Sequence, residues 1–368
     1  MSKSFTTQRL ADELGGQLVG DGTIHVTRLA HPADARDVGD LALAMDAKLL
    51  PLLANGKSRV AVVAGDAEVP AGSVEACIRV ARPRVVLSKL TNMFSEPVPV
   101  ASGIHPTAII EAGASIGANV TIGAQSFVGA GAVIGANSVL HPQVYIAPQA
   151  VIGENALIYS GVKVGAGVRI GARFIAHFNT SLGADGFSFV TPQTGSVEQV
   201  KADGGGEVTA SNSAFLRIAS LGGLVIGDDV EIGANTSIDQ GTIAPTRIGN
   251  GSKIDNQVQI GHNVQIGDNC LICGRVGIAG SVTVGNRVVL GGAAGVADHV
   301  EIGDDAVIMA MSGVAGNVRP RSVVGGFPAR PREQLLESYF NMSRLKSFFR
   351  KIEKIIERLD QLEKTPKE

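Results

Sequence analysis

The sequence lacks tryptophan, and aromatic residues of all kinds make up only 4 % of its 368 residues. It has three cysteines, which excludes a disulfide framework and suits a reducing compartment. No apolar stretch reaches the roughly 18 residues of a membrane-spanning helix, and the N-terminal residues 1–9 lack the apolar run of a signal peptide. We therefore expect a cytoplasmic protein without a transmembrane segment.

The chain also lacks an excess of charge of either sign. It has 32 basic and 34 acidic residues, a net charge of −2, so a partner made of nucleic acid is not expected. Hydrophobic residues make up 45 % of the chain, which is too many for a disordered protein. The 47 glycines follow no strict Gly-X-Y period, which excludes collagen.

An aliphatic residue recurs every six positions in the middle of the chain. It runs from Ile104 to Leu182, from Ile226 to Ile238 and, after a four-residue insertion, from Ile248 to Val314, in 29 hexads. Neither a helix nor an alternating strand has a period of six, whereas a parallel β-helix does. Each hexad is then a short strand and a corner, and three hexads close a triangular coil. We expect the first and fifth residues of each hexad to point inward, and aromatic rings to be too large for so narrow a core.

Two other parts flank this prism, which we expect over residues 101–319 with an insertion at 188–223. Residues 1–100 combine a helical stretch, Thr7–Leu14, with strand-like runs at 60–63 and 76–80, and indicate a small α/β domain. Residues 320–368 begin with a Pro/Gly-rich segment and continue as a helical extension over 333–363.

The C-terminal helix has apolar residues spaced alternately three and four apart, as in a coiled coil. They are Leu345, Phe348, Ile352, Ile355, Leu359 and Leu362. This seam predicts packing against the same or a neighbouring subunit. The other faces are basic, and they are either solvated or bind an acidic protein.

His262 is the strongest candidate for chemistry in the prism. It is the third residue of its hexad, so its ring should point outward, and Asp255 and Asn256 lie one hexad earlier. Many outward histidines are only solvated, but histidine is also the usual general base. The Cys270-x-x-Cys273 motif lies within the repeat and has no second cysteine pair, so we expect it to be structural and expect no metal site.

Several segments together carry a specific resemblance. They are Gly183–Phe187 (Gly-Ala-Asp-Gly-Phe), residues 226–241, residues 248–264 with Asp-Asn-Gln-Val-Gln-Ile-Gly-His-Asn, and 325–329 (Gly-Gly-Phe-Pro-Ala). Over nearly its whole length the chain resembles the UDP-3-O-acylglucosamine N-acyltransferases of lipid A biosynthesis, which are hexapeptide-repeat enzymes. The resemblance implies a left-handed β-helix and a homotrimer with active sites between neighbouring prisms. It implies as well that the small α/β domain of residues 1–100 binds a nucleotide.

The resemblance also implies the reaction. A 3-hydroxyacyl group moves from acyl carrier protein to the 2-amino group of a UDP-3-O-acylglucosamine, and no resident cofactor is needed because the carrier brings the acyl-phosphopantetheine. His262 matches the general base and Asp255 the acidic residue that orients it. The register of the next coil makes the Gly280 amide our candidate for the oxyanion hole. We expect a bulkier residue than Gly313 to limit the length of the acyl chain.

Further site residues follow from the same matches. The expected substrate contacts are His299, Asn256, Gln259, Asp46, Lys48, Asp185 and Phe187, and the expected carrier-protein contacts are Arg344, Lys346, Arg350 and Lys351.

One segment departs from the family. The family holds uracil with aromatic residues at two positions that are Leu43 and Leu49 in this chain. Stacking worth about 1–3 kcal/mol per base is lost at each. Asp46 and Lys48 remain as polar contacts, and the insertion offers Phe189 and Phe215 as substitutes.

Two other functions stay open at this point. One is a hexapeptide acetyltransferase that uses acetyl-CoA on another nucleotide sugar. The other is a β-helix module without catalytic activity. The N-terminal domain and the basic helix favour transfer from a carrier protein.

Overall fold

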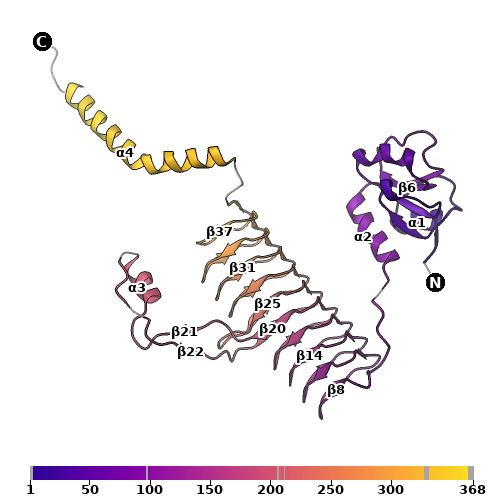
Figure 1. The fold of residues 1–368 in the computed structure, drawn as a ribbon, viewed down its shortest axis with the longest axis horizontal. Helices are drawn as coiled ribbons and strands as arrows, with labels where there is room; N and C mark the ends of the chain where they lie inside the picture. The colour runs from indigo at the N-terminus through magenta and orange to yellow at the C-terminus, as the bar shows by residue number, and fades with distance from the viewer. Residues whose placement is uncertain (1–2, 97, 205–206, 211, 327–330, 364–368) are drawn as a thin grey trace. The chain divides into compact units, whose positions relative to one another are not determined.

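The computed structural model describes residues 3–96, 98–204, 207–210, 212–326 and 331–363. The chain divides into two compact units, Met1–Pro99 and Val100–Glu368 (Figure 1). The sequence placed this division at residue 100.

The first unit is a small α/β domain. Its five-stranded sheet has the order β2 (Gln17–Gly20), β7 (Ala76–Val80), β6 (Val60–Ala64), β5 (Asp40–Ala44) and β4 (Arg28–Ala30). Only β2 runs antiparallel to its neighbour. The other elements are β1 (Phe5–Thr6), which pairs with β3 (His25–Val26), α1 (Thr7–Leu14), α2 (Pro83–Phe94), and the 3-10 helices η1 (Pro32–Asp34) and η2 (Ala47–Asn55). The helix expected at 7–14 and both expected strands are therefore confirmed.

Helix α1 forms where the sequence provides a cap at each end. The Thr6 hydroxyl accepts a hydrogen bond from the amide of Arg9, and Gly15 ends the helix with a left-handed φ of 65°. Leu10 and Leu14 on one face of the helix are buried against the sheet together with Leu90 of α2. This apolar face holds both helices on the sheet.

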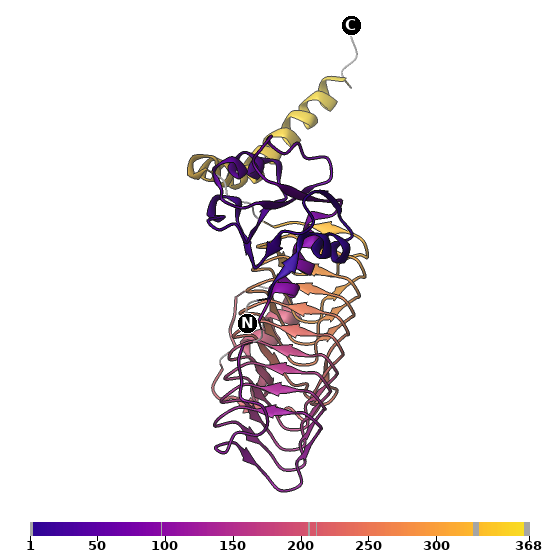
Figure 2. The same cartoon turned by 90° about the vertical axis from the view of Figure 1, so that its right-hand side faces the viewer.

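The second unit contains a three-sided parallel β-helix, whose stacked coils are visible in Figure 2. In the described residues its sheets have ten, ten and nine strands. The first sheet consists of β10 (Thr121–Ile122), β13 (Val139–Leu140), β16 (Leu157–Ile158), β19 (Ile175–Ala176), β24 (Glu231–Ile232), β27 (Lys253–Ile254), β30 (Leu271–Ile272), β33 (Val289–Leu290), β36 (Val307–Ile308) and β38 (Val323–Val324).

The second sheet follows the first around each coil. It consists of β8 (Ile109–Ile110), β11 (Phe127–Val128), β14 (Tyr145–Ile146), β17 (Lys163–Val164), β20 (Ser181–Ala184), β25 (Ser237–Asp239), β28 (Gln259–Ile260), β31 (Gly277–Ile278), β34 (Gly295–Val296) and β37 (Gly313–Val314). The third sheet consists of β9 (Ser115–Ile116), β12 (Val133–Ile134), β15 (Val151–Ile152), β18 (Arg169–Ile170), β23 (Leu224–Ile226), β26 (Thr246–Ile248), β29 (Gln265–Ile266), β32 (Thr283–Val284) and β35 (Glu301–Ile302).

The core of the prism has the periodicity that the hexads predict. First-position residues such as Ile122, Leu140 and Ile158 have no exposed surface and pair in register 18 residues apart. The prediction that aromatic rings do not fit is wrong at Phe174, which is completely buried. The next first-position residue is Ala176, also buried, and its small side chain leaves the volume that the ring occupies.

The corners depend on glycine where two coils approach closely. A Cβ atom on Gly135 would lie 2.4 Å from the amide nitrogen of Glu154 in the next coil, so only glycine fits. Other corner residues have a positive φ, and many of these are asparagines such as Asn137, at 58°.

The ends and the insertion differ in part from the expected boundaries. The prism does not stop at residue 319, because β38 continues the first sheet beside β36. The insertion forms an arm, residues 188–223, with β21 (Phe189–Val190), α3 (Ser196–Asp203) and β22 (Leu216–Arg217). The C-terminal helix α4 extends over Arg332–Glu363, and its seam residues Leu345, Phe348, Ile355 and Leu359 are exposed. Residues 327–329 of the Gly-Gly-Phe-Pro-Ala motif and the side chain of Leu362 lie outside the described part. In that part, no helix has the length and apolar character needed to cross a bilayer.

Candidate active site

His262 lines a cavity of about 600 Å³ at the corner that follows the second sheet. The lining residues are Asp185, Gly186, Phe187, Phe189, Arg217, Asp239, Gln259, Gly261, His262, Ile278, Ala279 and Gly280. The structure thus brings together five residues expected from the sequence, namely Asp185, Phe187, Gln259, His262 and Gly280.

Two glycines make room for the imidazole ring. A Cβ atom on Gly280, in the next coil, would lie 2.8 Å from both Cε1 and Nε2 of His262. A Cβ atom on Gly186 would lie 2.6 Å from the Cβ of His262. On its remaining side, Nδ1 of the ring is 2.9 Å from the side-chain Oδ1 of Asn263. The ring is therefore held in one orientation, with Nε2 beside Gly280.

The backbone amide of Gly280 has no hydrogen-bond acceptor among the described residues. At the corner after the third sheet, an Asp or Asn of the next coil accepts from the equivalent amide, as Asp268 does from Asn250 at 2.7 Å. The residue that would do this for Gly280 is Asp298, but its carboxylate binds Lys201 of α3 at 2.6 Å. The Gly280 N–H is therefore available to a ligand in the cavity, as an oxyanion hole requires.

The acidic residue beside His262 is Asp239, which the sequence analysis missed. It ends β25, the strand that pairs with β28 just before His262, and it is only 9 % exposed. Burial raises the pKa of Asp239, and a hydrogen bond from Gln259 Nε2 at 3.3 Å and the charge of His262 act in the opposite direction. Its one sequence signal is its place directly before the four-residue insertion, one coil ahead of the histidine.

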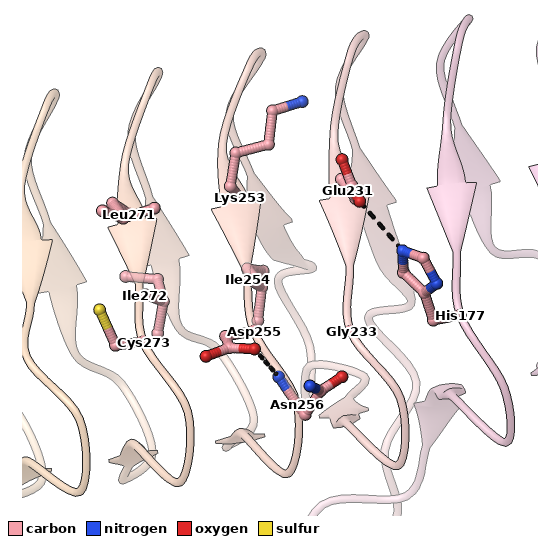
Figure 3. Close-up of a pocket in the computed structure, with 10 residues that line it drawn as sticks. All are labelled: His177, Glu231, Gly233, Lys253, Ile254, Asp255, Asn256, Leu271, Ile272 and Cys273. Carbon is pink, nitrogen blue, oxygen red and sulfur yellow. Dashed lines mark hydrogen bonds and ion pairs between the residues drawn. The ribbon is translucent and has the colours of Figure 1, made fainter. Parts of the chain in front are cut away.

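Asp255 and Asn256 lie at a different corner of the coil, after the first sheet. They line a groove of about 460 Å³ with His177, Glu231 and Lys253 (Figure 3). Asp255 accepts from the amide of Asn256 at 2.7 Å, and the side-chain oxygen of Asn256 accepts from the amide of Ala234 at 2.6 Å. Asp255 and His262 are separated because the six residues between them cross one side of the triangle. The expected pairing of Asp255 with His262 is therefore not formed within one prism.

The arm supplies the outer wall of the His262 cavity. Asp185 accepts hydrogen bonds from Gln240 Nε2 at 2.9 Å and Arg217 at 2.7 Å, and both lower its pKa. The Phe189 ring lies 5.1 Å from that of Phe187 and 6.5 Å from that of Phe215. Phe187 is 85 % exposed, so a large apolar surface faces the open side of the cavity.

His299 lies one coil beyond Gly280. Its amide donates to the Gly280 carbonyl at 3.2 Å, and the side chain is exposed. The structure thus places His299 near the His262 cavity but outside its wall.

Three glycines form a smooth strip on the second sheet below Gln259. Gln259, Gly277, Gly295 and Gly313 pair in register on four successive strands. A Cβ atom on any of the three glycines would meet nothing within 4 Å. The strip therefore leaves open space that begins at the His262 cavity and continues to Gly313.

The remaining expected contacts lie on other parts of the chain. Asp46 caps η2 by accepting from the amide of Lys48 at 3.0 Å, and both side chains are exposed. Leu43 and Leu49 are half-buried and pack against the two apolar cores of the first unit. The basic side chains of Arg344, Lys346, Arg350 and Lys351 are exposed on α4.

The cysteines have a packing role in the prism. Cys270 is 1 % exposed in the core, and Cys273 is half-buried at the corner of the first sheet. Within the described ranges, no three His, Cys, Asp or Glu side chains are grouped closely enough to hold a metal ion.

Comparison with known proteins gives two hexapeptide-repeat families. The bacterial transferase hexapeptide (six repeats) model matches residues 131–166 and 245–280. The model for the hexapeptide repeat of succinyl-transferase matches residues 108–146, 223–262 and 281–310. Both matches cover the coils that carry His262.

Relatives of similar length share much of the sequence. A protein from Ruegeria pomeroyi is 52 % identical over 275 residues, which is 75 % of this chain and 76 % of that protein. Relatives from Paracoccus denitrificans and Pseudomonas paraeruginosa are 54 % and 38 % identical over 75 % of this chain, and over 75 % and 72 % of their own. All three are named UDP-3-O-acylglucosamine N-acyltransferase.

A solved structure supports the fold. The UDP-N-acetylglucosamine acyltransferase of Arabidopsis matches with a TM-score of 0.51 at 24 % identity, over 66 % of this chain and 80 % of that one.

Proposed function

Because the chain belongs to the UDP-3-O-acylglucosamine N-acyltransferase family, we propose that it transfers a 3-hydroxyacyl group to the 2-amino group of a UDP-3-O-acylglucosamine in lipid A biosynthesis. The protein is an acyltransferase. The observation that carries the proposal is the cavity in which Nε2 of His262 lies beside the free amide of Gly280.

His262 is the general base of the proposed reaction. Nε2 takes a proton from the amine as the amine nitrogen attacks the thioester carbonyl carbon. The new C–N bond forms, the C–S bond breaks, and the imidazolium returns its proton to the departing thiolate. The one transferred proton stays within the cavity, and the step needs no metal or resident cofactor.

The Gly280 amide stabilises the negative charge on the carbonyl oxygen in the tetrahedral intermediate. It is suited to this role because no group among the described residues accepts a hydrogen bond from it. A removed oxyanion donor typically costs about 10²–10³-fold in kcat, so the amide is an important part of the proposed site.

The acyl donor is proposed to be an acyl carrier protein thioester. An acidic carrier protein would bind the exposed basic residues Arg344, Lys346, Arg350 and Lys351 of α4. The acyl chain would lie along the strip of Gly277, Gly295 and Gly313, where the sheet has no side chains. The uridine would bind the first unit at Asp46 and Lys48. The reaction would take place in the cytoplasm, where such carrier proteins occur.

The proposed assembly is a homotrimer that brings Asp255 of one chain to His262 of the next. This arrangement would explain why Asp255 and His262, which belong to one family motif, lie at different corners of the same prism. Mixing His262→Ala and Asp255→Ala chains before reassembly tests it. About one quarter of wild-type activity is expected, because a working site needs one chain of each kind in one order. Activity no higher than that of the separate variants would contradict a two-chain site.

A purified-enzyme assay tests the reaction itself. Acyl carrier protein thioesters of several lengths and acetyl-CoA are each offered with a UDP-amino sugar. Transfer from the carrier and not from acetyl-CoA supports the proposal, and the reverse result favours an acetyltransferase. His262→Ala should lower kcat by about 10²–10⁴-fold. His105→Ala, in the first coil, is the matched control and should leave kcat unchanged. Unchanged activity in both variants would indicate a module without this catalytic centre.

A further inference from the structure

The prism contains a four-residue insertion between Ile238 and Ile248 that the hexad pattern does not require. It lies within the loop 241–245, which leads from the second sheet to β26 of the third. Gly241 is needed there because a Cβ atom would lie 1.8 Å from the carbonyl oxygen of Ala244. The loop is also tied to the base of the arm, since the amide of Leu221 donates to the carbonyl of Thr242 at 2.7 Å. Such a well-ordered insertion beside the cavity calls for a role.

The loop and the strand after it bind the side chain of Asn263 through several hydrogen bonds. The amide of Thr242 donates to Asn263 Oδ1 at 3.1 Å, and Asn263 Nδ2 donates to the carbonyl of Ala244 at 2.9 Å. The backbone amide of Asn263 donates to the hydroxyl of Thr246 at 2.9 Å. Asn263 has a left-handed φ of 62°, which asparagine tolerates better than most residues.

These partners determine which way the Asn263 amide points. A backbone N–H can only donate and a backbone carbonyl can only accept. Turning the amide over would place two donors together at Thr242 and two acceptors together at Ala244. Oδ1 therefore faces His262, and the atom 2.9 Å from it, Nδ1, must carry a proton to make the hydrogen bond.

We propose that Asn263, held by the 241–245 insertion, is a positioning residue that fixes His262 in its Nδ1–H tautomer. A neutral imidazole has one protonated nitrogen, so Nε2 keeps its lone pair. This is the nitrogen beside Gly280 that the proposed reaction uses as the base. The inference rests on the proposed function for its catalytic meaning, while the tautomer itself is measurable without turnover.

Several charged groups surround the ring. They are Asp239 on β25, Asp185 and Arg217 at the base of the arm, Lys201 on α3, and Asp298 and His299 at the next coil. Asp239 lines the same cavity as the ring, and no ion pair joins the two side chains in the described part of the chain. The test therefore changes only the group that contacts Nδ1.

The first measurement uses the unaltered protein. Nitrogen-15 NMR of histidine-labelled protein, with the His262 signals assigned by their loss in His262→Ala, reports which ring nitrogen carries the proton above pH 8. We expect Nδ1 protonated and Nε2 unprotonated. The opposite tautomer overturns the inference whether or not the protein shows acyl transfer.

The second measurement uses Asn263→Asp and Asn263→Ala. The aspartate places a negative charge on Nδ1 and stabilises the imidazolium, so the acidic limb of the kcat/KM profile should move to higher pH by about one unit. The pH profile for ethoxycarbonylation of His262 by diethyl pyrocarbonate, followed by mass spectrometry, should shift by the same amount. The alanine should lower kcat at least about tenfold with little change in KM, within the 10²–10⁴-fold that a general base contributes.

The matched control is Asn269→Asp. Asn269 is also an asparagine at a corner with a positive φ of 55°, but it is exposed and lies at the corner after the third sheet. Its profiles should coincide with those of the wild type. An ethoxycarbonylation profile of Asn263→Asp that also coincides with the wild type overturns the inference. If the wild type transfers no acyl group from any thioester but the pH profile of His262 modification still shifts in Asn263→Asp, the proposed function is wrong and the tautomer assignment stands.

Discussion

Gly280→Ala changes the active site by one methyl group and nothing else. The φ of Gly280 lies outside the left-handed region, so the backbone accepts alanine without strain. The new Cβ would lie 2.8 Å from Cε1 and Nε2 of His262. The ring has little freedom to move away, because Asn263 binds its Nδ1 and Gly186 lies against its Cβ.

The structure sets the size of the expected effect. Ordinary contacts between such atoms are about 3.5–4.0 Å, so Nε2 must shift by roughly 1 Å. A misplacement of about 1 Å costs on the order of 10²-fold in rate. We therefore expect kcat to fall about 100-fold, which corresponds to about 2.7 kcal/mol of activation free energy. KM for the sugar nucleotide should change little, since the Gly280 amide and the remaining contacts stay in place.

Steady-state kinetics with a carrier-protein thioester measures kcat and KM of Gly280→Ala, and thermal unfolding measures its stability. Gly316→Ala is the matched control, because Gly316 has the same corner position two coils further on and a Cβ atom there meets nothing within 4 Å. Gly316→Ala should unfold at or slightly above the wild-type temperature, since a compatible Gly→Ala change adds about 0.4–1 kcal/mol of stability. Gly280→Ala should stay folded but unfold at a lower temperature, because the crowded methyl group costs about 1–3 kcal/mol. A folded Gly280→Ala enzyme with kcat within twofold of the wild type would refute the assigned position of the base.

Three further predictions concern the acyl strip and two carboxylates. Gly313→Met should shift the preference toward shorter thioesters, with each excluded methylene costing about 0.8 kcal/mol, or roughly fourfold in kcat/KM, and an unchanged preference would reject the strip as the acyl site. Asp239→Asn should raise the unfolding temperature at neutral pH and not near pH 3.5. Burial raises the pKa of Asp239, so its contribution is fully present below the ordinary carboxyl value of about 3.9 and is lost as the pH rises through the folded value. Calorimetry at both pH values checks this, and an equal gain at both contradicts it. Asp40→Asn should destabilise the first unit by about 1–3 kcal/mol at neutral pH, because the hydrogen bond from Arg28 lowers the pKa of this buried carboxyl while Arg28 itself remains solvated. That stability is present above the ordinary carboxyl pKa and is lost as the pH falls through the folded value, so urea titrations of wild type and variant should converge in acid.

The fold was largely predictable because its rule is local. Each hexad repeats the same strand and corner, so a period of six in the sequence implies stacked coils and an aliphatic core. The prediction that aromatic rings do not fit failed at Phe174 because it concerned a property that is not local. Whether a ring fits depends on the volume left by Ala176, and volume is a property of the packed core that no single position carries.

The site was predictable only in part. The sequence by itself determined that His262 points outward, that Gly280 lies one coil away and that Gln259 accompanies them, because residues 18 apart in an unbroken repeat stack. Only the tertiary structure decided that Asp239 lies beside the histidine and that Asn263 fixes the ring, whereas the unbroken hexads from Ile248 onward already place Asp255 one corner away from His262. The physical reason is that insertions break the period of six. The arm and the 241–245 loop change which residues share a corner, and only the folded coils show which residues those are.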